Sequence, residues 1–345
     1  MVRAAVIAMA CVLSGCGVPG EPLPPLLNIP SVARDLAAVQ VDARLHVTWT
    51  APSLTTEGTR IGEIGKSEIL AMFTPDGASP ANFVTQARPV GTLSGGPLPG
   101  AGQQGVFDMP LTRDRIHQKV LVAVRIYGTN GKEAGLSNIA SAQILDLAQP
   151  PANVEAKLTE EAIVLSWSAP ALSALGGPAP AGTRYQIFRA DNAPAQSATL
   201  IGTADSLEYL DSSFEFGHKY IYAIRSFAGE GQNTAISSPS TFIDVNAADK
   251  FPPATPRNVR AITVPGAVEL AWSPNSEPDL AGYNVYRSTG SEEGLAARLN
   301  QQPLEVPVYR DTQVTAGASY SYRIRAVDRN GNESSPSDGV PATAE

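Results

Sequence analysis

Apolar and polar residues alternate along three short segments of the chain, and each segment ends at one of its three tryptophans. A side-chain period of two with one apolar face is typical of a β-strand that packs on one side. A proline follows each tryptophan within three positions and cannot donate to a strand ladder, so each strand should end there. The apolar positions are Leu45, Val47 and Trp49; Ile163, Leu165 and Trp167; and Val268, Leu270 and Trp272.

The three segments are copies of an internal repeat. Thirteen positions separate the first apolar residue of each copy (Leu36, Val154 or Val259) from its tryptophan. The second and third copies align again, without a gap, from Tyr209 and from Tyr309 onward. Short alternating strands at a spacing of about ten residues, with turn residues between them, favour an all-β sandwich. The shared positions are Tyr209/Tyr309, Asp211/Asp311, Gly217/Gly317, Tyr220/Tyr320, Tyr222/Tyr322, Ile224/Ile324 and Arg225/Arg325.

This pattern resembles that of fibronectin type III domains. Those domains have a tryptophan shortly before a proline, a third strand with tyrosine and arginine, and a sixth strand with paired tyrosines after a glycine. The resemblance implies that the hydroxyl of Tyr320 bonds back to the chain at the corner that Gly317 opens. The matching residues of the third copy are Trp272, Pro274, Tyr283, Val285, Tyr286, Gly317, Tyr320, Tyr322, Ile324 and Ala326.

The resemblance covers nearly all of the chain after its first thirty residues. It implies three tandem fibronectin type III-like (immunoglobulin-like) β-sandwiches, at 31–147, 150–247 and 252–345. The first is divergent, because it has Val120 and Val122 where the others have tyrosines and because its loops are longer. Its corner hydrogen bond is therefore in question, whereas its fold is expected to be the same. Linkers are expected at the proline-containing stretches LAQPP and AADKFPP.

The first sixteen residues have the pattern of a secretory signal. Arg3 precedes an apolar run of about ten residues, Ala4 to Leu13, which is too short to span a bilayer as a helix. The following Leu13-Ser14-Gly15-Cys16 resembles the lipobox of bacterial lipoproteins. The resemblance implies that 1–15 is a lipoprotein signal peptide and that Cys16 carries lipid after cleavage. The alternative is an ordinary cleaved signal beside a coincidental cysteine.

Residues 16–30 are expected to form the lipidated cysteine and a tether, which its prolines would keep extended. Gly17 follows the cysteine, whereas an Asp at this position commonly retains lipoproteins of Gram-negative bacteria at the inner membrane. The resemblance therefore favours the outer membrane of the cell envelope, with the face of that membrane left open. Because the cysteines are Cys11 and Cys16, no disulfide would join the sandwiches.

Composition and charge indicate a folded chain with more than one core and argue against nucleic acid as a partner. A hydrophobic fraction of 43% and a charged fraction of 17% fit a folded chain, and 345 residues are too many for one ordinary core. The net charge is −8 and no segment is basic, so nucleic acid is not expected as a partner. Membrane association is expected through the lipid on Cys16.

Two stretches imitate ligand-binding loops. Ile61–Ser67 (IGEIGKS) contains the Gly-Lys-Ser of a phosphate-binding loop, but Arg60 stands where that motif requires glycine. The stretch from Asp328 (DRNGNES) has alternating oxygen-bearing side chains like a calcium loop, but Glu333 replaces the required glycine. Asn330-Gly331 instead favours a hairpin turn. No cofactor site and no metal site are therefore predicted.

No catalytic constellation is predicted either. His46 is expected on the solvent face of its strand, and His117 and His218 belong to different sandwiches. No serine occupies a Gly-x-Ser-x-Gly turn, and sandwiches with short loops leave no deep cleft for paired carboxylates. The chain is therefore predicted not to be an enzyme.

The predicted function is that of a non-enzymatic, lipid-anchored cell-envelope protein that acts as a spacer or protein-interaction scaffold. The alternative is a polysaccharide-binding or polysaccharide-degradation accessory lipoprotein. Sugar binding needs exposed aromatic rings, yet all three tryptophans and eight of the ten tyrosines occupy repeat-matched positions. A protein partner of unknown identity is expected, and we expect it to contact the Gly/Pro-rich insertion Gly91 to Gly105 of the first sandwich.

Overall fold

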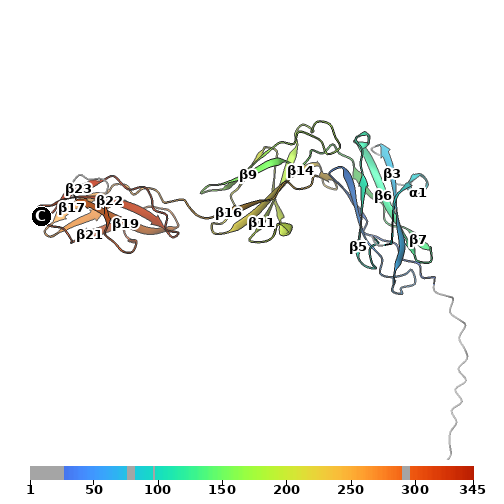
Figure 1. Ribbon diagram of the computed structural model, residues 1–345, viewed down its shortest axis with the longest axis horizontal. Coiled ribbons are helices and arrows are strands. Elements are labelled where there is room, and N and C mark those ends of the chain that lie inside the picture. The colour runs from blue at the N-terminus through green and yellow to red at the C-terminus, as the bar shows by residue number, and fades with distance from the viewer. Residues whose placement is uncertain (1–26, 76–81, 96–97, 290–295) are drawn as a thin grey trace, which may run out of the picture. The chain divides into compact units, whose positions relative to one another are not determined.

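The computed structural model describes residues 27–75, 82–95, 98–289 and 296–345, and nearly all of its regular structure is β-strand (Figure 1). The prediction of an all-β fold is confirmed. The described residues include a four-residue helix, α1 (Phe83–Gln86), and none of their helices is long and apolar enough to cross a bilayer. The predicted signal peptide and Cys16 lie outside the described residues, as does most of the predicted tether.

The chain divides into two compact units, and three hydrophobic clusters each contain one tryptophan. The cluster around Trp49 lies in the first unit, and those around Trp167 and Trp272 lie in the second. The limits of the three predicted sandwiches stay a prediction. The first unit comprises Met1–Pro150, Pro170–Arg184 and Arg225–Ser238, and the second comprises Pro151–Ala169, Tyr185–Ile224 and Pro239–Glu345.

The first unit contains two sheets around its cluster. In one sheet β1, β2 and β5 are antiparallel neighbours, and β15 (Asn233–Ile236) lies parallel to β1 on its other side. The other sheet has the order β4-β3-β6, with β7 and β8 following one another along β6. Helix α1 covers the outer face of β3 and β6, where Phe83 packs against Leu70, Met72 and Leu121. The strands are β1 (Ala37–Val41), β2 (Arg44–Thr50), β3 (Ile64–Pro75), β4 (Arg88–Ser94), β5 (Gln104–Pro110), β6 (Gln118–Gly128), β7 (Glu133–Leu136) and β8 (Ala140–Gln143).

The second unit repeats this arrangement around each of its two clusters. Around Trp167 the sheet β13-β10-β9 faces strands β12, β11, β14 and β16. The strands are β9 (Ala152–Leu158), β10 (Ile163–Ser168), β11 (Arg184–Asp191), β12 (Thr199–Ala204), β13 (Glu208–Asp211), β14 (Lys219–Glu230) and β16 (Ile243–Asn246).

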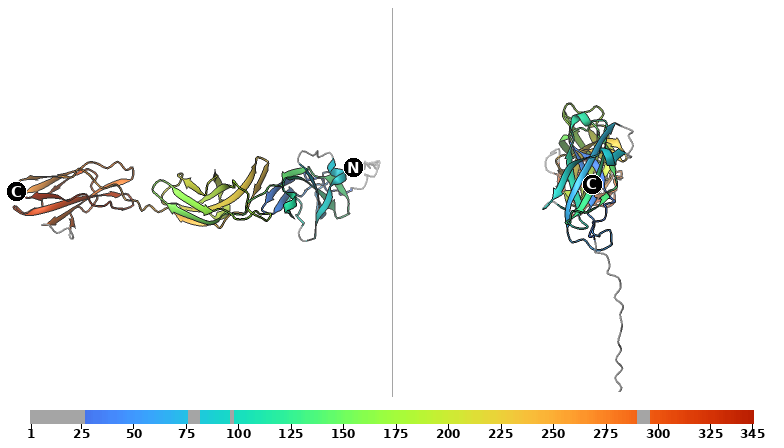
Figure 2. Two further views of the ribbon diagram at one scale, coloured as in Figure 1. Left: turned by 90° about the horizontal axis from the view of Figure 1, so that it is seen from above. Right: turned by 90° about the vertical axis from the view of Figure 1, so that its right-hand side faces the viewer.

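Around Trp272 the sheet β17-β18-β21 faces the sheet β20-β19-β22-β23, whose strands run side by side in orange to red in Figure 2. Three strands facing four in this order make a fibronectin type III-like sandwich, as predicted. The strands are β17 (Arg260–Val264), β18 (Ala267–Ala271), β19 (Leu280–Thr289), β20 (Ala297–Arg298), β21 (Val308–Asp311), β22 (Ser319–Asp328) and β23 (Val340–Thr343).

Repeated hydrogen bonds explain the matched tyrosines of the second and third sandwiches. The hydroxyl of Tyr320 accepts the N–H of Thr315 at 3.0 Å, and that of Tyr220 accepts the N–H of Glu215 at 2.8 Å. The predicted corner bond of Tyr320 is therefore confirmed. In the first sandwich the fold is kept although Val120, which is buried, has no hydroxyl to form this bond.

A buried carboxylate in each of these two sandwiches accepts hydrogen bonds from one arginine and one tyrosine. Both carboxylates, Asp211 and Asp311, are 2% exposed. A buried charge requires such partners, because leaving water is costly. The bonds to Asp211 come from Arg189 (2.7 Å) and Tyr222 (2.7 Å), and those to Asp311 come from Arg287 (2.7 Å) and Tyr322 (2.9 Å).

These hydrogen bonds shift the pKa values of Asp211 and Tyr222 in the second sandwich. Burial alone would raise the pKa of Asp211, but hydrogen bonds from Ser213, Tyr222 and Arg189 outweigh it and hold the pKa below its ordinary value of 3.8. Burial raises the pKa of Tyr222, and its hydrogen bond to the Asp211 carboxylate raises it further. The carboxylate is therefore ionised and the phenol neutral at neutral pH.

The first sandwich replaces this polar group with apolar side chains. Leu45 pairs with Met109 where Val268 of the third sandwich pairs with Asp311. Val122 pairs with Ala71 at the position where Tyr322 pairs with Arg287 in the third sandwich. Met109, Val122 and Ala71 all belong to the first cluster. At this position the fold is therefore stabilised by apolar packing in place of the buried ion pair.

Two stretches expected to be loops are partly strand, and that part of the interpretation was wrong. Within the predicted insertion Gly91 to Gly105, four residues belong to β4 and the last two to β5. A Cβ at Gly91 would lie 2.3 Å from the Phe107 ring, and one at Gly105 would lie 2.5 Å from the Trp49 ring. These glycines let an aromatic ring lie against the backbone of a strand. The stretch Ile61–Ser67, which contains the Gly-Lys-Ser of a phosphate-binding loop, likewise ends on β3, where Gly65, Lys66 and Ser67 lie.

Candidate functional site

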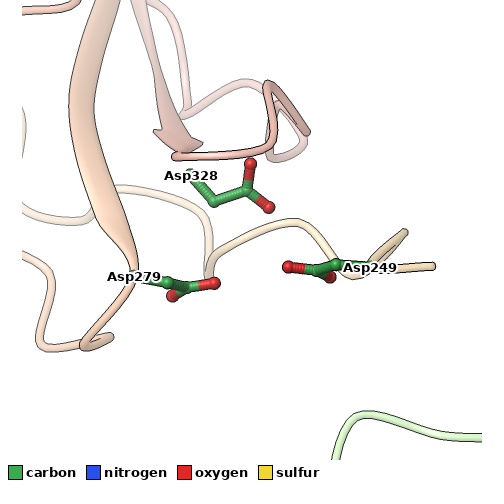
Figure 3. A group of neighbouring side chains, drawn as sticks. All are labelled: Asp249, Asp279 and Asp328. Carbon is green, nitrogen blue, oxygen red and sulfur yellow. The ribbon is translucent and has the colours of Figure 1, made fainter. Parts of the chain in front are cut away.

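Three aspartates from separate segments of the second unit bring their carboxyl groups together (Figure 3). Asp249 follows β16, Asp279 immediately precedes β19, and Asp328 is the last residue of β22. One carboxylate oxygen of each lies within 4.8 Å of the other two. Asp328 is buried and the other two are half-buried. Of the three, only Asp328 belongs to the calcium-loop-like stretch found in the sequence. Asp249 and Asp279 are distant from it in sequence, and the fold brings them close.

The hairpin turn after β22 holds this group in place. The Asp328 carboxylate accepts the backbone N–H groups of Asn330 (2.9 Å) and Asn332 (2.8 Å) and the side-chain amide of Asn332 (2.7 Å). Asp249 accepts the side-chain amide of Asn330 at 2.7 Å. Gly331 has φ +87°, so the predicted turn is confirmed, with positive φ at the glycine alone. The turn chemistry of these residues therefore attaches the Asp249 segment to the third sandwich.

Clustered carboxylate oxygens are the ligands that Ca²⁺ and Mg²⁺ prefer, so Asp249, Asp279 and Asp328 could together hold such an ion. The N–H of Phe251 also donates to Asp249 at 3.1 Å. Five N–H donors therefore already offset the negative charges of Asp249 and Asp328. These bonds hold Asp249 and Asp328 in place without a cation. We assign no ion to the group, and the prediction that the chain has no metal site stays a prediction.

The three histidines stand at different elements: His46 lies on β2, His117 directly precedes β6, and His218 directly precedes β14. His46 points away from the first cluster and its Nδ1 is 2.7 Å from Asp108, and His117 is exposed. His218 has its Nδ1 2.9 Å from Asp191 and its Nε2 3.5 Å from Glu215. Within the described residues none of these rings bonds to a serine or threonine hydroxyl, so the structure assembles no activated nucleophile around them.

The aromatic side chains all lie in described residues, and nearly all of them are buried or half-buried. The three tryptophans are 1%, 5% and 6% exposed. Phe242, at 43%, is the one aromatic residue whose side chain is largely exposed, and the others are buried or half-buried. A flat sugar-stacking platform needs neighbouring exposed rings, and the described surface does not provide a pair of them.

Among curated proteins, the chain is similar to small parts of enzymes. No protein-family model matches the chain. Exoglucanase B of Cellulomonas fimi is 30% identical over 169 residues, which cover 47% of this chain and 14% of the enzyme. An amylopullulanase of Thermoanaerobacterium saccharolyticum is 33% identical over 136 residues, which cover 38% of this chain and 10% of the enzyme.

Among solved structures, the fibronectin domains FN1–FN3 of chicken CNTN1 match 92% of this chain and 99% of their own. The sequence identity is 14% and the TM-score is 0.29. The sheets and hydrophobic clusters described above make this protein a tandem of fibronectin type III-like sandwiches. Its matched parts span 14% and 10% of the two enzymes it is similar to.

Proposed function

We propose that this protein is a non-catalytic accessory protein of polysaccharide degradation, whose sandwiches serve as spacer and protein-binding modules. The observation that supports it best is the extent of the similarity. Nearly half of this chain resembles a small part of exoglucanase B, and more than a third resembles a small part of an amylopullulanase. The names of the two similar enzymes refer to different glucans, which favours a role other than recognition of one sugar.

Contact with protein rather than with sugar is supported by the burial of the aromatic side chains. The tryptophans and the matched tyrosines belong to the three clusters, so they are committed to packing and to internal hydrogen bonds. Direct polysaccharide binding is the second candidate, and the names of the similar enzymes favour it. It would depend on half-buried rings and on Phe242, which are poor stacking surfaces.

The proposal includes a lipid anchor on Cys16 that would hold the body at the cell envelope, with the outer membrane favoured. It rests on the lipobox resemblance of Leu13-Ser14-Gly15-Cys16. A protein partner would then bind close to the membrane, and the insertion Gly91 to Gly105 stays our predicted contact. The residues that would carry the anchor lie outside the described part of the chain.

The test uses the chain from Leu27 to Glu345, which contains all three clusters. It should release no reducing sugar from cellulose or pullulan and should stay in solution when insoluble cellulose or starch is sedimented. Immobilised, it should retain a polysaccharide hydrolase from a cell-envelope extract. Release of sugar would show an enzyme instead, and sedimentation with the polymer that is weakened by Phe242→Ala would support the second candidate.

A further inference from the structure

The first sandwich is hydrogen-bonded to a strand from much later in the chain. Strand β15 (Asn233–Ile236) runs parallel to β1, with Gln40 opposite Ala235 and Val41 opposite Ile236. The backbone N–H of Asp42 donates to the carbonyl of Ile236 at 2.9 Å. All of these residues belong to the first compact unit. The outer edge of β1 is therefore covered by a segment that the predicted first sandwich, 31–147, does not include.

Side chains attach β1 to its neighbours at its C-terminal end. The Asp42 carboxylate accepts the backbone N–H of Ser238 at 2.8 Å and is also hydrogen-bonded by the Ser238 hydroxyl. Asp42 has φ +49°, which aspartate adopts more readily than most residues. Gln40, which is 1% exposed, bonds both ways to the backbone of Leu145, at 3.0 Å and 2.8 Å. The strand is thus attached to 225–238 and to the chain that leaves the first sandwich.

Part of the linker at LAQPP is buried against the first sandwich and a second late segment, 170–184. Leu147 and Ala148 are buried, and Gln149 donates its N–H to the carbonyl of Leu172 at 3.0 Å. Leu175 packs against the first hydrophobic cluster, and the buried Ser173 hydroxyl bonds to Asp146. An exposed hinge would leave such apolar side chains in water. Leu147 and Ala148 instead belong to the interior of the first unit.

A glycine shows how closely the segments meet. Gly229 has φ +82°, and a Cβ on it would lie 2.6 Å from the side chain of Leu145 and 1.9 Å from the carbonyl of Asn233. The buried Ser226 hydroxyl donates to the carbonyl of Gln149 at 2.8 Å. The segment 225–238 is therefore fitted to the end of the first sandwich by backbone conformation, packing and hydrogen bonds together.

We propose that the first sandwich and the segments 170–184 and 225–238 form one cooperative folding unit, so that the first sandwich does not unfold or detach by itself. Separating these segments would break a strand pair and expose Leu147 and Leu175 to water in the same step. Segments that are joined in this way open together as one unit. The proposal concerns the chain itself and does not depend on the proposed function.

The test is native-state hydrogen exchange on the chain from Leu27 to Glu345. Val47→Ala removes buried methyl groups from the first cluster and should speed exchange of its slowest amides at least about tenfold. The amides of β15 and of 170–184 should speed up by the same factor. Leu270→Ala, at the corresponding position of the third sandwich, is the matched control and should leave both segments unchanged.

Asp42→Gly removes the carboxylate bonds to Ser238, while glycine can keep the φ value of this residue. In an Asp42→Gly background, Val47→Ala should therefore speed exchange in β15 by a smaller factor than it does in the unmodified chain. Should Val47→Ala fail to fold, Ile69→Val is a milder change in the same cluster. Acceleration in β2 and β6 without any in β15 and 170–184 would overturn the proposal.

Discussion

The buried group around Asp211 offers a sharp test of what stabilises the second sandwich. Replacing Arg189 by methionine keeps most of the aliphatic volume but removes the guanidinium that donates to Asp211 at 2.7 Å. Tyr222 and Ser213 would still donate, yet the carboxylate would be a buried charge without a countercharge. We therefore expect Arg189→Met to destabilise this sandwich strongly.

The size of the effect follows from burial. Removing one partner of a buried ion pair costs about 3–5 kcal/mol. We expect the lower end, about 3 kcal/mol, because the Arg189 side chain is still 17% exposed whereas Asp211 is 2% exposed. Such a loss is a large fraction of the roughly 5–15 kcal/mol that is typical of a whole domain. Partial unfolding of the second sandwich should therefore be detectable well below its normal melting temperature.

The measurement is urea unfolding of the chain from Leu27 to Glu345, followed by hydrogen exchange in β10 and β14. Arg310→Met is the matched control, because Arg310 pairs at 3.1 Å with the exposed Glu269 and its loss should cost less than about 1 kcal/mol. Combining Arg189→Met with Asp211→Asn should recover stability, since it removes the unpaired charge. Equal costs for the two arginine variants would refute the reasoning.

Acid adds a second test of the same group. The folded pKa of Asp211 lies below its ordinary value of 3.8, so its ionised form stabilises the sandwich above about pH 4 and this contribution is lost as the pH falls through the folded pKa. In Arg189→Met the pKa should rise, because burial is then less opposed. The cost of the variant should therefore shrink below about pH 4, and a cost that stays constant down to about pH 3 would contradict this account.

Three further changes test other parts of the structure. Cys16→Ala should abolish incorporation of labelled fatty acid and cleavage at that site, and labelling of the variant would show the lipobox assignment to be wrong. Trp272→Ala should cost about 3–5 kcal/mol and speed hydrogen exchange in β22 while β6 is unchanged. Gly105→Ala should cost about 1–3 kcal/mol in thermal unfolding because its Cβ would meet the Trp49 ring, whereas Gly62→Ala, with open space around it, should be neutral.

The sequence predicts the sandwiches well because their signals are local and repeated. Alternation around Trp49, Trp167 and Trp272 identifies the buried face of each second strand, and the glycine before Tyr320 marks the corner. Strand β4 is not evident from the sequence, because Gly91 resembles a loop residue but is a place where the Phe107 ring lies against the backbone. A single sequence does not distinguish a flexible glycine from one that an aromatic ring requires.

The pairing of distant segments was beyond prediction for a different reason. Neither Asp42 nor Ser238 stands in a motif, and their bond depends on the parallel pairing of β1 with β15, which no local pattern encodes. The meeting of Asp249 and Asp279 with Asp328 is likewise a product of the fold. The Arg189–Asp211 pair is an intermediate case, since the repeat marks Asp211 but only the structure shows that Arg189 donates to it.

Because each cluster buries one tryptophan, intrinsic tryptophan fluorescence can report on the folding of each sandwich. Trp49, Trp167 and Trp272 are buried among the apolar side chains of their clusters, so each ring should emit at short wavelength. Trp167 and Trp272 each have a tyrosine ring 5.2 Å away, at Tyr185 and Tyr283, close enough to pass excitation energy to the indole. Retaining one tryptophan at a time, with phenylalanine at the other two positions, would let the fluorescence of the intact chain follow each sandwich separately.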